Sequence, residues 1–485
     1  MNRTSAVGIL LLLLTLAIGQ SLRAEEAHTV TTASGPIVGH DHQGTWRYLG
    51  IPYAKAPEGP RRWQAPVPID AWTKPLVADS FPSPCPSTHT MSILSFFTRR
   101  ALLRYMPVVG SEDCLFLNVW EPQKPSVHPR PVMVFIHGGG FFFGSTGERF
   151  TDLGPPLYEA SRLAAREDVV VVSMNYRLGF LGYFAHPELK DSQGRNEGNF
   201  GLQDQLLALR WVQDHIAAFG GDPQSVTIFG ESAGASSVEA LLATDQSSGL
   251  FHKAIMQSPL FLERSHEAAR DLTAKILQES ECKDVACLRS LPSQKLAQIG
   301  RDYAVNLDTQ ATLITGTATL PDPTIFAGIR RRQLKIPIIV GVNQKELLSR
   351  IFHENIPYDT AIYCNARALP KLFAPEQVYA YWFNHSLIKG GPAMHVLEVP
   401  FVFGTIADIK GPFLTSEDEN FSKQMSHAWA EFARSGHPGS EAFPWPTYGR
   451  EGTLKTLNLP GIASPTDLPS QIDCQSPWVQ SRISE

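Results

Sequence analysis

The chain has 485 residues, of which 43% are hydrophobic and 18% charged, with 37 glycines and 37 prolines. These proportions are typical of a globular protein, and the length is sufficient for a large core. The net charge is −5, and the longest run of like charge is Arg330-Arg331-Arg332. Lys and Arg are otherwise spread along the chain, which excludes the concentrated positive surface of a nucleic-acid-binding protein.

The N-terminus is typical of a secretory signal peptide. Arg3 precedes a largely apolar run of 13 residues, Ala6 to Ile18, and short polar and small residues follow up to Ala24. The run is too short for a membrane anchor, which needs about 20 residues. We therefore predict a signal peptide over 1–24 and one domain over 25–485, exported to an oxidising compartment such as the periplasm, the secretory lumen or the exterior. No later segment is apolar and long enough to be a transmembrane span.

The cysteine count supports export. An even number of cysteines in an exported chain favours three disulfides over metal ligation, and no Cys-x-x-Cys motif is present, so we expect no metal site. Asn384-His385-Ser386 and Asn420-Phe421-Ser422 have the form of glycosylation sequons, which are meaningful only in a eukaryotic secretory route. The six cysteines are Cys85, Cys114, Cys282, Cys287, Cys364 and Cys474.

The first elements, "HTVTTASGPIVGH" and "TWRYLGIPYA", alternate apolar and polar residues and predict antiparallel strands. Later runs are apolar throughout, as in parallel strands buried on both faces, and helical stretches separate them. This alternation predicts an α/β fold with a central, mostly parallel, twisted sheet and helices on both of its faces. The predicted buried strands are Val132–Ile136, Val169–Met174, Val226–Phe229 and Ile336–Val342, and two of the predicted helices are Pro156–Ala165 and Gly201–Phe219.

Three of these strands end in residues that suit catalysis. The first is followed by His137-Gly138-Gly139-Gly140, the third by the turn around Ser232, and the fourth by Asn343-Gln344-Lys345-Glu346. Functional residues of parallel sheets gather at the carboxyl ends of the strands. A serine, then an acid, then a later histidine is the order found in α/β-hydrolases.

The turn Gly230-Glu231-Ser232-Ala233-Gly234 is a Gly-x-Ser-x-Gly motif between a strand and a helix. The glycines permit a strained turn that exposes the serine hydroxyl, and a neighbouring imidazole is needed to make that hydroxyl a nucleophile. The positive end of the following helix favours the developing oxyanion. The amides expected to donate to the oxyanion are those of Gly139, Gly140 and Ala233.

The glycine loop has an alternative interpretation as a phosphate-binding loop, because Gly139-x4-Gly144-Ser145 has part of that spacing. The lysine that should precede the serine is missing, and three phenylalanines fill the interior of the motif. Aromatic walls suit an acyl or alkyl group better than a triphosphate. We therefore exclude nucleotide binding and expect Phe141, Phe142 and Glu231 to contribute to a substrate pocket.

The residues alone leave the histidine and the acid less certain. Glu346 is favoured because it lies just past a strand end, whereas Glu354 and Asp322 do not. His395 follows the loop Lys389-Gly390-Gly391-Pro392, but a lone histidine is more often structural. The histidines that follow Glu346 are His353, His385, His395, His427 and His437.

Motifs in order along the chain resemble those of type-B carboxylesterases, the family of carboxylesterases, cholinesterases and some lipases. They are "GIPYAKAPEGPRRWQAP", "EDCLFLNVW", "HGGGFFFGS", "NYRLGFLGYF", "GNFGLQDQLLALRWV", "GGDPQSVTIFGESAG", "GVNQKE", "HVLEVPFVFG", "FARSGHP" and "WPTY". The resemblance covers nearly the whole mature chain. It implies an α/β-hydrolase fold, an esterase without cofactor, and a triad of Ser232, Glu346 and His395.

The resemblance also implies the oxyanion donors Gly139, Gly140 and Ala233, and the pairings Cys85–Cys114, Cys282–Cys287 and Cys364–Cys474. Two neighbours of the triad depart from the family pattern. The family usually has Asp-Glu-Gly around the acid, where this chain has Lys345-Glu346-Leu347, and Gly after the histidine, where it has Val396. Both departures place a bulkier residue beside the triad.

The expected substrate is a small hydrophobic or short-to-medium-chain ester. The loop 85–114 has no Trp to stack on a quaternary ammonium and carries Arg99, Arg100 and Arg104, which disfavours a cholinesterase. The same loop places Leu94, Phe97, Ala101 and Tyr105 at helical spacing, so a lipase lid is an alternative to simple packing on the body of the protein. A binding protein without activity is a further alternative, because some relatives with this fold have lost the serine.

Overall fold

The computed structural model describes residues 27–88, 106–149, 154–303, 310–346, 358–387, 391–409, 414–459 and 472–483. The predicted signal peptide, Leu347 and the proposed lid residues lie outside these ranges. No helix among the described residues combines the length and the apolar character that crossing a membrane requires.

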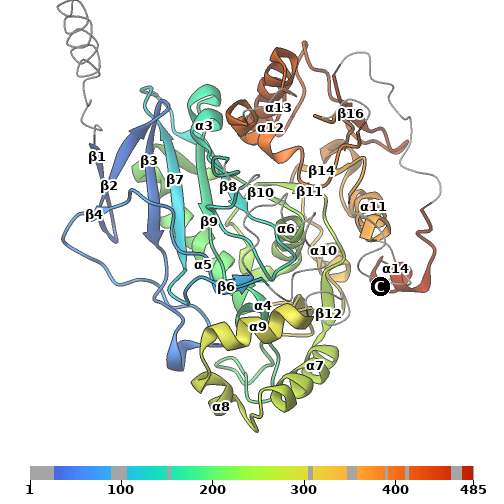
Figure 1. Ribbon diagram of the computed structural model, residues 1–485. Coiled ribbons are helices and arrows are strands. Elements are labelled where there is room, and N and C mark those ends of the chain that lie inside the picture. Colours follow the sequence, from blue (N-terminus) through green and yellow to red (C-terminus); the bar gives the residue numbers. More distant parts are fainter. Residues whose placement is uncertain are drawn as a thin grey trace, which may run out of the picture.

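A 12-stranded sheet forms the centre of the protein, in the order β1-β2-β3-β7-β9-β8-β10-β11-β14-β15-β16, with β4 beside β2 (Figure 1). From β9 to β16 all neighbouring strands are parallel, whereas β1, β2, β3 and β7 pair antiparallel. The predicted sheet, with its antiparallel opening, is confirmed. Its strands are β1 Ala27–Thr32, β2 Gly35–His42, β3 Thr45–Pro52, β4 Leu76–Val77, β7 Phe116–Pro122, β8 Arg130–Ile136, β9 Val170–Met174, β10 Gly221–Glu231, β11 Lys253–Gln257, β14 Ile338–Asn343, β15 Val378–Phe383 and β16 Lys455–Leu457.

Helices cover both faces of the sheet, because successive residues of a central strand point to opposite sides. In β8, Val132 and Val134 belong to one buried cluster, and Met133 and Phe135 to the other. The first cluster includes residues of α5 and α6, and the second includes residues of α3, α12 and α13, which lie across the sheet (Figure 1). The bounds are α3 Ser161–Glu167, α5 Phe200–His215, α6 Ala233–Ala243, α12 Val399–Phe403 and α13 Ser416–Ser435.

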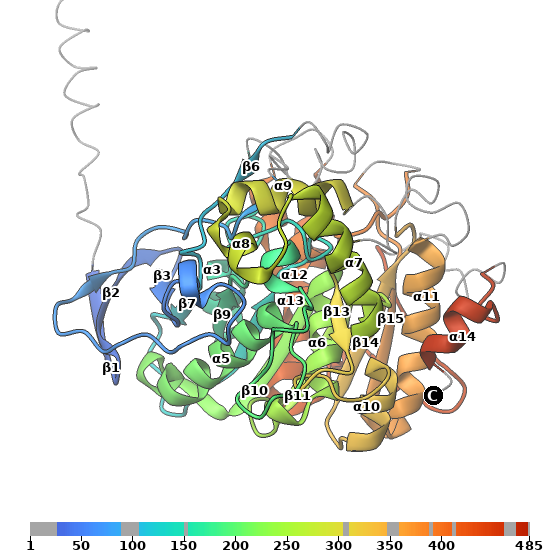
Figure 2. The ribbon, with the colours of Figure 1, turned by 90° about the horizontal axis from the view of Figure 1, so that it is seen from below.

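The remaining helices lie around this core. The helices α7, α8 and α9 lie near one another at the lower end of the molecule in Figure 1, and α14 lies against α11 (Figure 2). A two-stranded parallel sheet, β12 with β13, is separate from the central one. The bounds are α4 Gly179–Gly182, α7 His266–Glu279, α8 Val285–Ser290, α9 Ser293–Tyr303, α10 Ile325–Arg332, α11 Tyr358–Ala368, α14 Pro477–Ile483, β5 Ser87–Thr88, β6 Val108–Val109, β12 Glu263–Ser265 and β13 Leu313–Thr315.

Local sequence signals explain the longest helix, α13. Thr415 accepts the N–H of Asp418, and the Asp418 carboxylate accepts the N–H of Thr415, so the two residues form a capping box. The helix ends at Gly436, whose φ of 81° is the left-handed conformation that glycine favours. Its buried apolar stripe packs on the sheet and consists of Phe421, Met425, Trp429 and Phe432.

The predicted helix 156–165 begins later than expected, at Ser161. The preceding backbone has other partners, because Leu157 N–H donates to Glu148 O at 2.6 Å and Arg149 bridges to Pro156. The predicted helix 201–219 is α5 followed by a 3-10 turn over Ile216–Phe219. The strand β11 was not predicted, since it is short and begins with a lysine.

Candidate active site

Ser232 lies on a sharp turn between β10 and α6. Its backbone has φ 56° and ψ −123°, a conformation that a residue other than glycine rarely adopts. A Cβ on Gly230 would lie 2.5 Å from the carbonyl of Gly234, and a Cβ on Gly234 would lie 2.0 Å from Ile136 O. Gly230 is therefore required because the turn folds back on itself, and Gly234 is required because the turn is pressed against the end of β8.

The glycine loop that follows β8 lies directly against this turn. A Cβ on Gly138 would lie 3.1 Å from the Cβ of Ser232. Gly139 and Gly140 have φ of 107° and 59°, and Gly139 O accepts the N–H groups of Phe142 and Phe143. In the part of the chain that the structure describes, the N–H groups of Gly139, Gly140 and Ala233 donate no hydrogen bond. Two of these amides belong to the glycine loop, and the third belongs to Ala233, the first residue of α6 directly after Ser232.

His395 and Glu346 come from two loops that the backbone joins. His395 N–H donates to Lys345 O, and Lys345 N–H donates to Ala393 O, each at 2.9 Å. The Nδ1 of His395 lies 2.5 Å from Glu346 Oε2. A carboxylate only accepts, so Nδ1 carries the proton, and in the neutral imidazole Nε2 has a lone pair.

The Glu346 carboxylate is buried and held from its other side. Its Oε1 accepts the N–H of Asn343 at 2.6 Å and the hydroxyl of Ser258 at 2.9 Å. Ser258 directly follows β11, the strand between β10 and β14. The carboxylate therefore keeps one orientation toward the imidazole.

A second carboxylate faces the other nitrogen of the imidazole. His395 Nε2 lies 3.0 Å from Oε1 of Glu231, the residue before Ser232. The contact is an ion pair when the imidazole is protonated, because Nε2 then carries a proton that faces the carboxylate. The contact places Nε2 at the serine turn.

Burial and charge act in opposite directions on these groups. Burial lowers the pKa of His395, but the carboxylates of Glu231 and Glu346 outweigh it and raise the pKa well above the usual value. Burial raises the pKa of Glu346, although its bonds from His395, Asn343 and Ser258 oppose this. A protonated imidazole is therefore favoured here more than in water.

A third buried glutamate, Glu398, lies behind the pair. It accepts hydrogen bonds from the side-chain amides of Gln257 and Asn343. Burial, together with the charge of Glu231, raises the pKa of Glu398 to about 7. Trp429 on α13 donates to Gln257 Oε1 at 3.2 Å, which connects the group to the helical layer.

Two of the residues that depart from the family pattern, Lys345 and Val396, lie among the described residues. Lys345 reaches Asp359, with Nζ 3.4 Å from Oδ2. Val396 has φ 75°, is 3% exposed and packs in the cluster with α12 and α13. A β-branched residue in this conformation is a genuine outlier, so its surroundings impose the backbone geometry after His395.

Phe141, Phe142 and Glu231, the residues predicted to contribute to a substrate pocket, have different surroundings. Phe141 is fully buried, its ring packs on Tyr183, and its carbonyl accepts the N–H of Gly179. Phe142 is 7% exposed and lies under Gly140, where an added Cβ would approach its ring to 2.7 Å. Glu231 faces His395, as described above.

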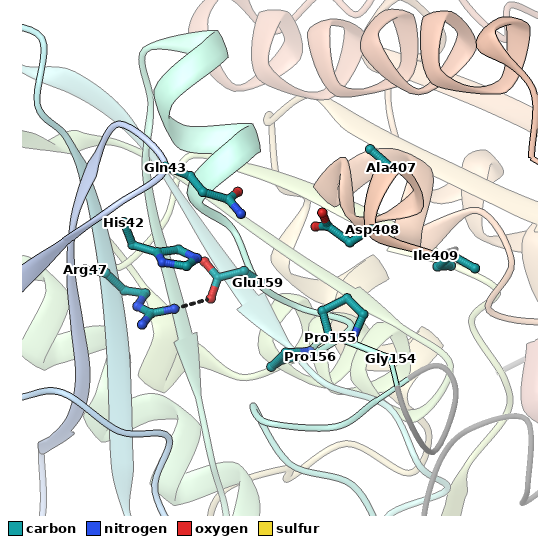
Figure 3. A pocket seen from close by; sticks show the side chains of 10 residues that line it. All are labelled: His42, Gln43, Arg47, Gly154, Pro155, Pro156, Glu159, Ala407, Asp408 and Ile409. Carbon is teal, nitrogen blue, oxygen red and sulfur yellow. Dashed lines mark hydrogen bonds and ion pairs between the residues drawn. The ribbon is translucent and has the colours of Figure 1, made fainter. Parts of the chain in front are cut away.

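A cavity of about 700 Å³ lies elsewhere, between the β2–β3 turn, the segment before α3, and residues 407–409 (Figure 3). Arg47, on the wall of the cavity, lies opposite Trp120 in the pairing of β3 with β7. Trp120 in turn lies opposite Val171, near the start of β9. The cavity is therefore at the amino-terminal side of the parallel strands, away from Ser232. Its charged groups are paired, as in the contact of Arg47 with Glu159 at 3.0 Å.

The three disulfides follow the pairing that the family resemblance implied. They join Cys85 to Cys114, Cys282 to Cys287 and Cys364 to Cys474. The second joins the connection between α7 and α8 to α8 itself, and the third connects α11 to the segment before α14. Among the described residues no cysteine is free.

Comparison with known proteins decides the family. The model of the carboxylesterase family matches residues 26–361 and 355–464. The chain belongs to the carboxylesterase family. It is 33% identical to para-nitrobenzyl esterase of Bacillus subtilis (strain 168), an alignment that covers 89% of this chain and 94% of that protein. It is 31% identical to human cocaine esterase, over 94% of this chain and 92% of the relative.

Solved structures agree with this membership. A thermophilic PNB esterase matches with a TM-score of 0.73 and 31% identity, covering 89% of this chain and 96% of that one. The α/β-hydrolase fold that the resemblance implied is therefore confirmed, and the chain is a carboxylesterase-family enzyme.

Sequence reasoning missed the groups that support the carboxylesterase site. Ser258, Gln257, Asn343 and Glu398 were not singled out, although Asn343 and Glu398 lie three residues from Glu346 and His395. Recognition of β11 would have placed Gln257 and Ser258 at the carboxyl edge of the sheet. No pattern in the sequence shows that Glu398 returns toward that edge.

Proposed function

We propose that this chain hydrolyses carboxylic esters through an acyl-enzyme formed on Ser232. The observation that supports the proposal is the position of the His395 ring, with Nδ1 2.5 Å from Glu346 Oε2 and Nε2 3.0 Å from Oε1 of Glu231, the residue before Ser232. Membership of the carboxylesterase family supports the reaction class.

His395 Nε2 takes the proton of Ser232 as the serine oxygen attacks the ester carbonyl carbon. The C=O electrons move to the carbonyl oxygen, and the resulting oxyanion accepts hydrogen bonds from the amides of Gly139, Gly140 and Ala233. Each donor of this kind typically contributes about 3 kcal/mol. When the oxyanion collapses, the alcohol leaves with the proton from His395. Water then repeats the cycle and releases the acid.

The carboxylates around His395 act on the charge that this proton transfer creates. Glu346 holds the ring in one tautomer and stabilises the imidazolium, and Glu231 adds a second negative charge at Nε2. The N-terminus of α6 directs its positive end at the same turn, which favours the oxyanion. No cofactor takes part in this sequence.

A serine-directed probe tests the assignment. A fluorophosphonate should label the wild type at one site, and Ser232→Ala should abolish both labelling and hydrolysis of 4-nitrophenyl butanoate. Ser248→Ala is a matched control, because Ser248 is exposed and far along the chain from the turn. Labelling of Ser232→Ala at the wild-type rate would exclude Ser232 as the nucleophile.

The proposed substrates are hydrophobic or short-to-medium-chain esters, which the aromatic loop 141–143 favours. The relatives' names include esterases for para-nitrobenzyl esters and cocaine, and a mouse cholinesterase is 32% identical. A choline ester is disfavoured by the arginines of the 85–114 loop. A lipase remains the second candidate because of the apolar spacing in that loop. Activity that rises abruptly above the solubility limit of tributyrin would favour the lipase, and smooth saturation would favour the esterase.

We also propose that the chain is exported and that the mature form is one domain from residue 25. Three disulfides suit an oxidising compartment. N-terminal sequencing of the mature protein should begin at Glu25. A mature chain that retains Met1 would contradict signal cleavage.

A further inference from the structure

Gln310 is a buried glutamine that contacts the glycine loop of the site. It is 1% exposed, and its Nε2 lies 3.3 Å from Gly140 O. Only the NH₂ group of an amide can donate to a carbonyl, so this contact determines which end of the amide is Oε1. Within the described chain, Oε1 has no hydrogen-bond partner and is screened from solvent.

The backbone around Gln310 is held firmly, so the side chain does not reach another partner by a local shift. Arg264 on β12 donates from Nη2 to Gln310 O at 2.5 Å and from Nε to Thr312 Oγ1 at 3.2 Å. Leu313, three residues after Gln310, starts the strand β13, which pairs with β12. A buried acceptor that is held in place and left without a donor costs free energy unless a ligand supplies one.

The contact with Gly140 O places this acceptor beside the glycine loop. Gly140 is two residues from Gly138, which lies against Ser232, and the Gly140 amide is one of the proposed oxyanion donors. The two polar groups of Gln310 belong to one planar amide, so its Oε1 lies within a few ångströms of the glycine loop. An ester bound with its carbonyl oxygen at that loop brings its substituents next to Gln310.

We propose that Gln310 determines specificity by accepting a hydrogen bond from a hydroxyl or amide N–H that the ester carries close to its carbonyl group. The inference rests on the proposed ester hydrolysis and names the substrate class of the same site. A site built to bond a donor rejects the analogue that lacks it, because the buried acceptor then stays unpaired. A purely hydrocarbon ester is therefore a poorer substrate than its hydroxylated counterpart.

The test compares esters in which a methyl group is replaced by a hydroxyl. The series contains 4-nitrophenyl alkanoates with the replacement at successive acyl carbons, and butanoate esters with the same replacement in the alcohol. The measured quantity is the ratio of kcat/KM for the hydroxyl ester to that for the methyl ester. In the wild type we expect a ratio of about ten or more for at least one pair, which corresponds to about 1.4 kcal/mol.

Gln310→Met has similar length and no amide acceptor, so we expect its ratio to fall to about one for the same pair. The matched control is Gln246→Met, because exposed Gln246 makes the same kind of contact, Nε2 to Ala318 O at 3.3 Å. Its ratio should equal that of the wild type. Gln310→Leu must repeat the loss, so that the conclusion does not depend on one variant.

The proposal is overturned if no pair shows a preference in the wild type, or if the preference survives in both Gln310 variants. Equal losses on both members of a pair would show that Gln310 only orients the glycine loop. Failure of the proposed ester hydrolysis is distinguishable, since then neither member of any pair is hydrolysed and Ser232→Ala changes nothing.

Discussion

Gly234→Ala tests whether the serine turn depends on close backbone contact with β8. The substitution adds one methyl group at the second residue of α6. The new Cβ would lie 2.0 Å from Ile136 O and 2.9 Å from His137 O, both backbone atoms at the carboxyl end of β8. Carbon atoms pack best at about 3.5–4.0 Å, so the helix and the strand must separate by more than about 1 Å.

The loss of stability in Gly234→Ala depends on which atoms have to move to accommodate the new methyl group. Overpacking of a well-packed interior typically costs about 1–3 kcal/mol. Here the obstacle is the backbone of a central strand that is bonded on both sides, to β9 and β10, so the cost lies at or above the upper end, about 3 kcal/mol. The same displacement moves Ser232 relative to the glycine loop, and a misplacement of about 1 Å lowers activity by about 100-fold.

Gly300→Ala is the matched control, because Gly300 is a buried helical glycine in α9. Its added Cβ would lie 3.4 Å from the Phe180 ring and 3.9 Å from the Phe180 backbone nitrogen, which are ordinary van der Waals contacts. Alanine favours a helix over glycine by about 1 kcal/mol, so this variant should be as stable as the wild type or more stable. Urea unfolding midpoints and kcat/KM for 4-nitrophenyl butanoate measure both effects. A Gly234→Ala enzyme with wild-type midpoint and activity would refute the reasoning.

Three further predictions concern other parts of the structure. Glu231→Gln removes a charge that raises the pKa of His395, so the acid limb of the kcat/KM profile should move to lower pH, and an unmoved limb would contradict the assigned contact. Val396→Gly removes a buried side chain but relieves a left-handed backbone, whereas Val402→Gly removes a buried side chain from a helix and relieves no strain. Val402→Gly should therefore lower the free energy of unfolding by about 2 kcal/mol more than Val396→Gly does. Equal losses in urea unfolding would argue against backbone strain at Val396. Replacing both cysteines of the Cys364–Cys474 bridge, whose sequence separation is 110, should lower the free energy of unfolding by about 5 kcal/mol. Replacing both cysteines of the Cys282–Cys287 bridge, whose separation is 5, should lower it by about 2 kcal/mol, and thermal unfolding can measure both.

Some features of the site were predictable from local sequence because local sterics decide them. Gly230 and Gly234 around Ser232 are required by a turn of a few residues, and an apolar strand before it with a helix after it is visible in the pattern. The predicted strands that end at 136, 229 and 342 place their following loops at one edge, because parallel strands share a direction. This is why the sequence offered Ser232 and the glycine loop as candidates, and favoured Glu346 over other acids.

His395 was not determined in this way, since five histidines follow Glu346 and each fits some structural role. Its position depends on a backbone bridge between residues 345 and 394, a contact across about 50 residues that no local pattern encodes. The same holds for Glu398 and Gln257, which meet beside the Glu346–His395 pair only after α12 returns to the sheet. The sequence by itself predicted the serine turn, four buried strands and, through the family resemblance, the reaction class. The tertiary structure decided which charges surround the imidazole, because electrostatic contact depends on distances between segments that only packing brings together.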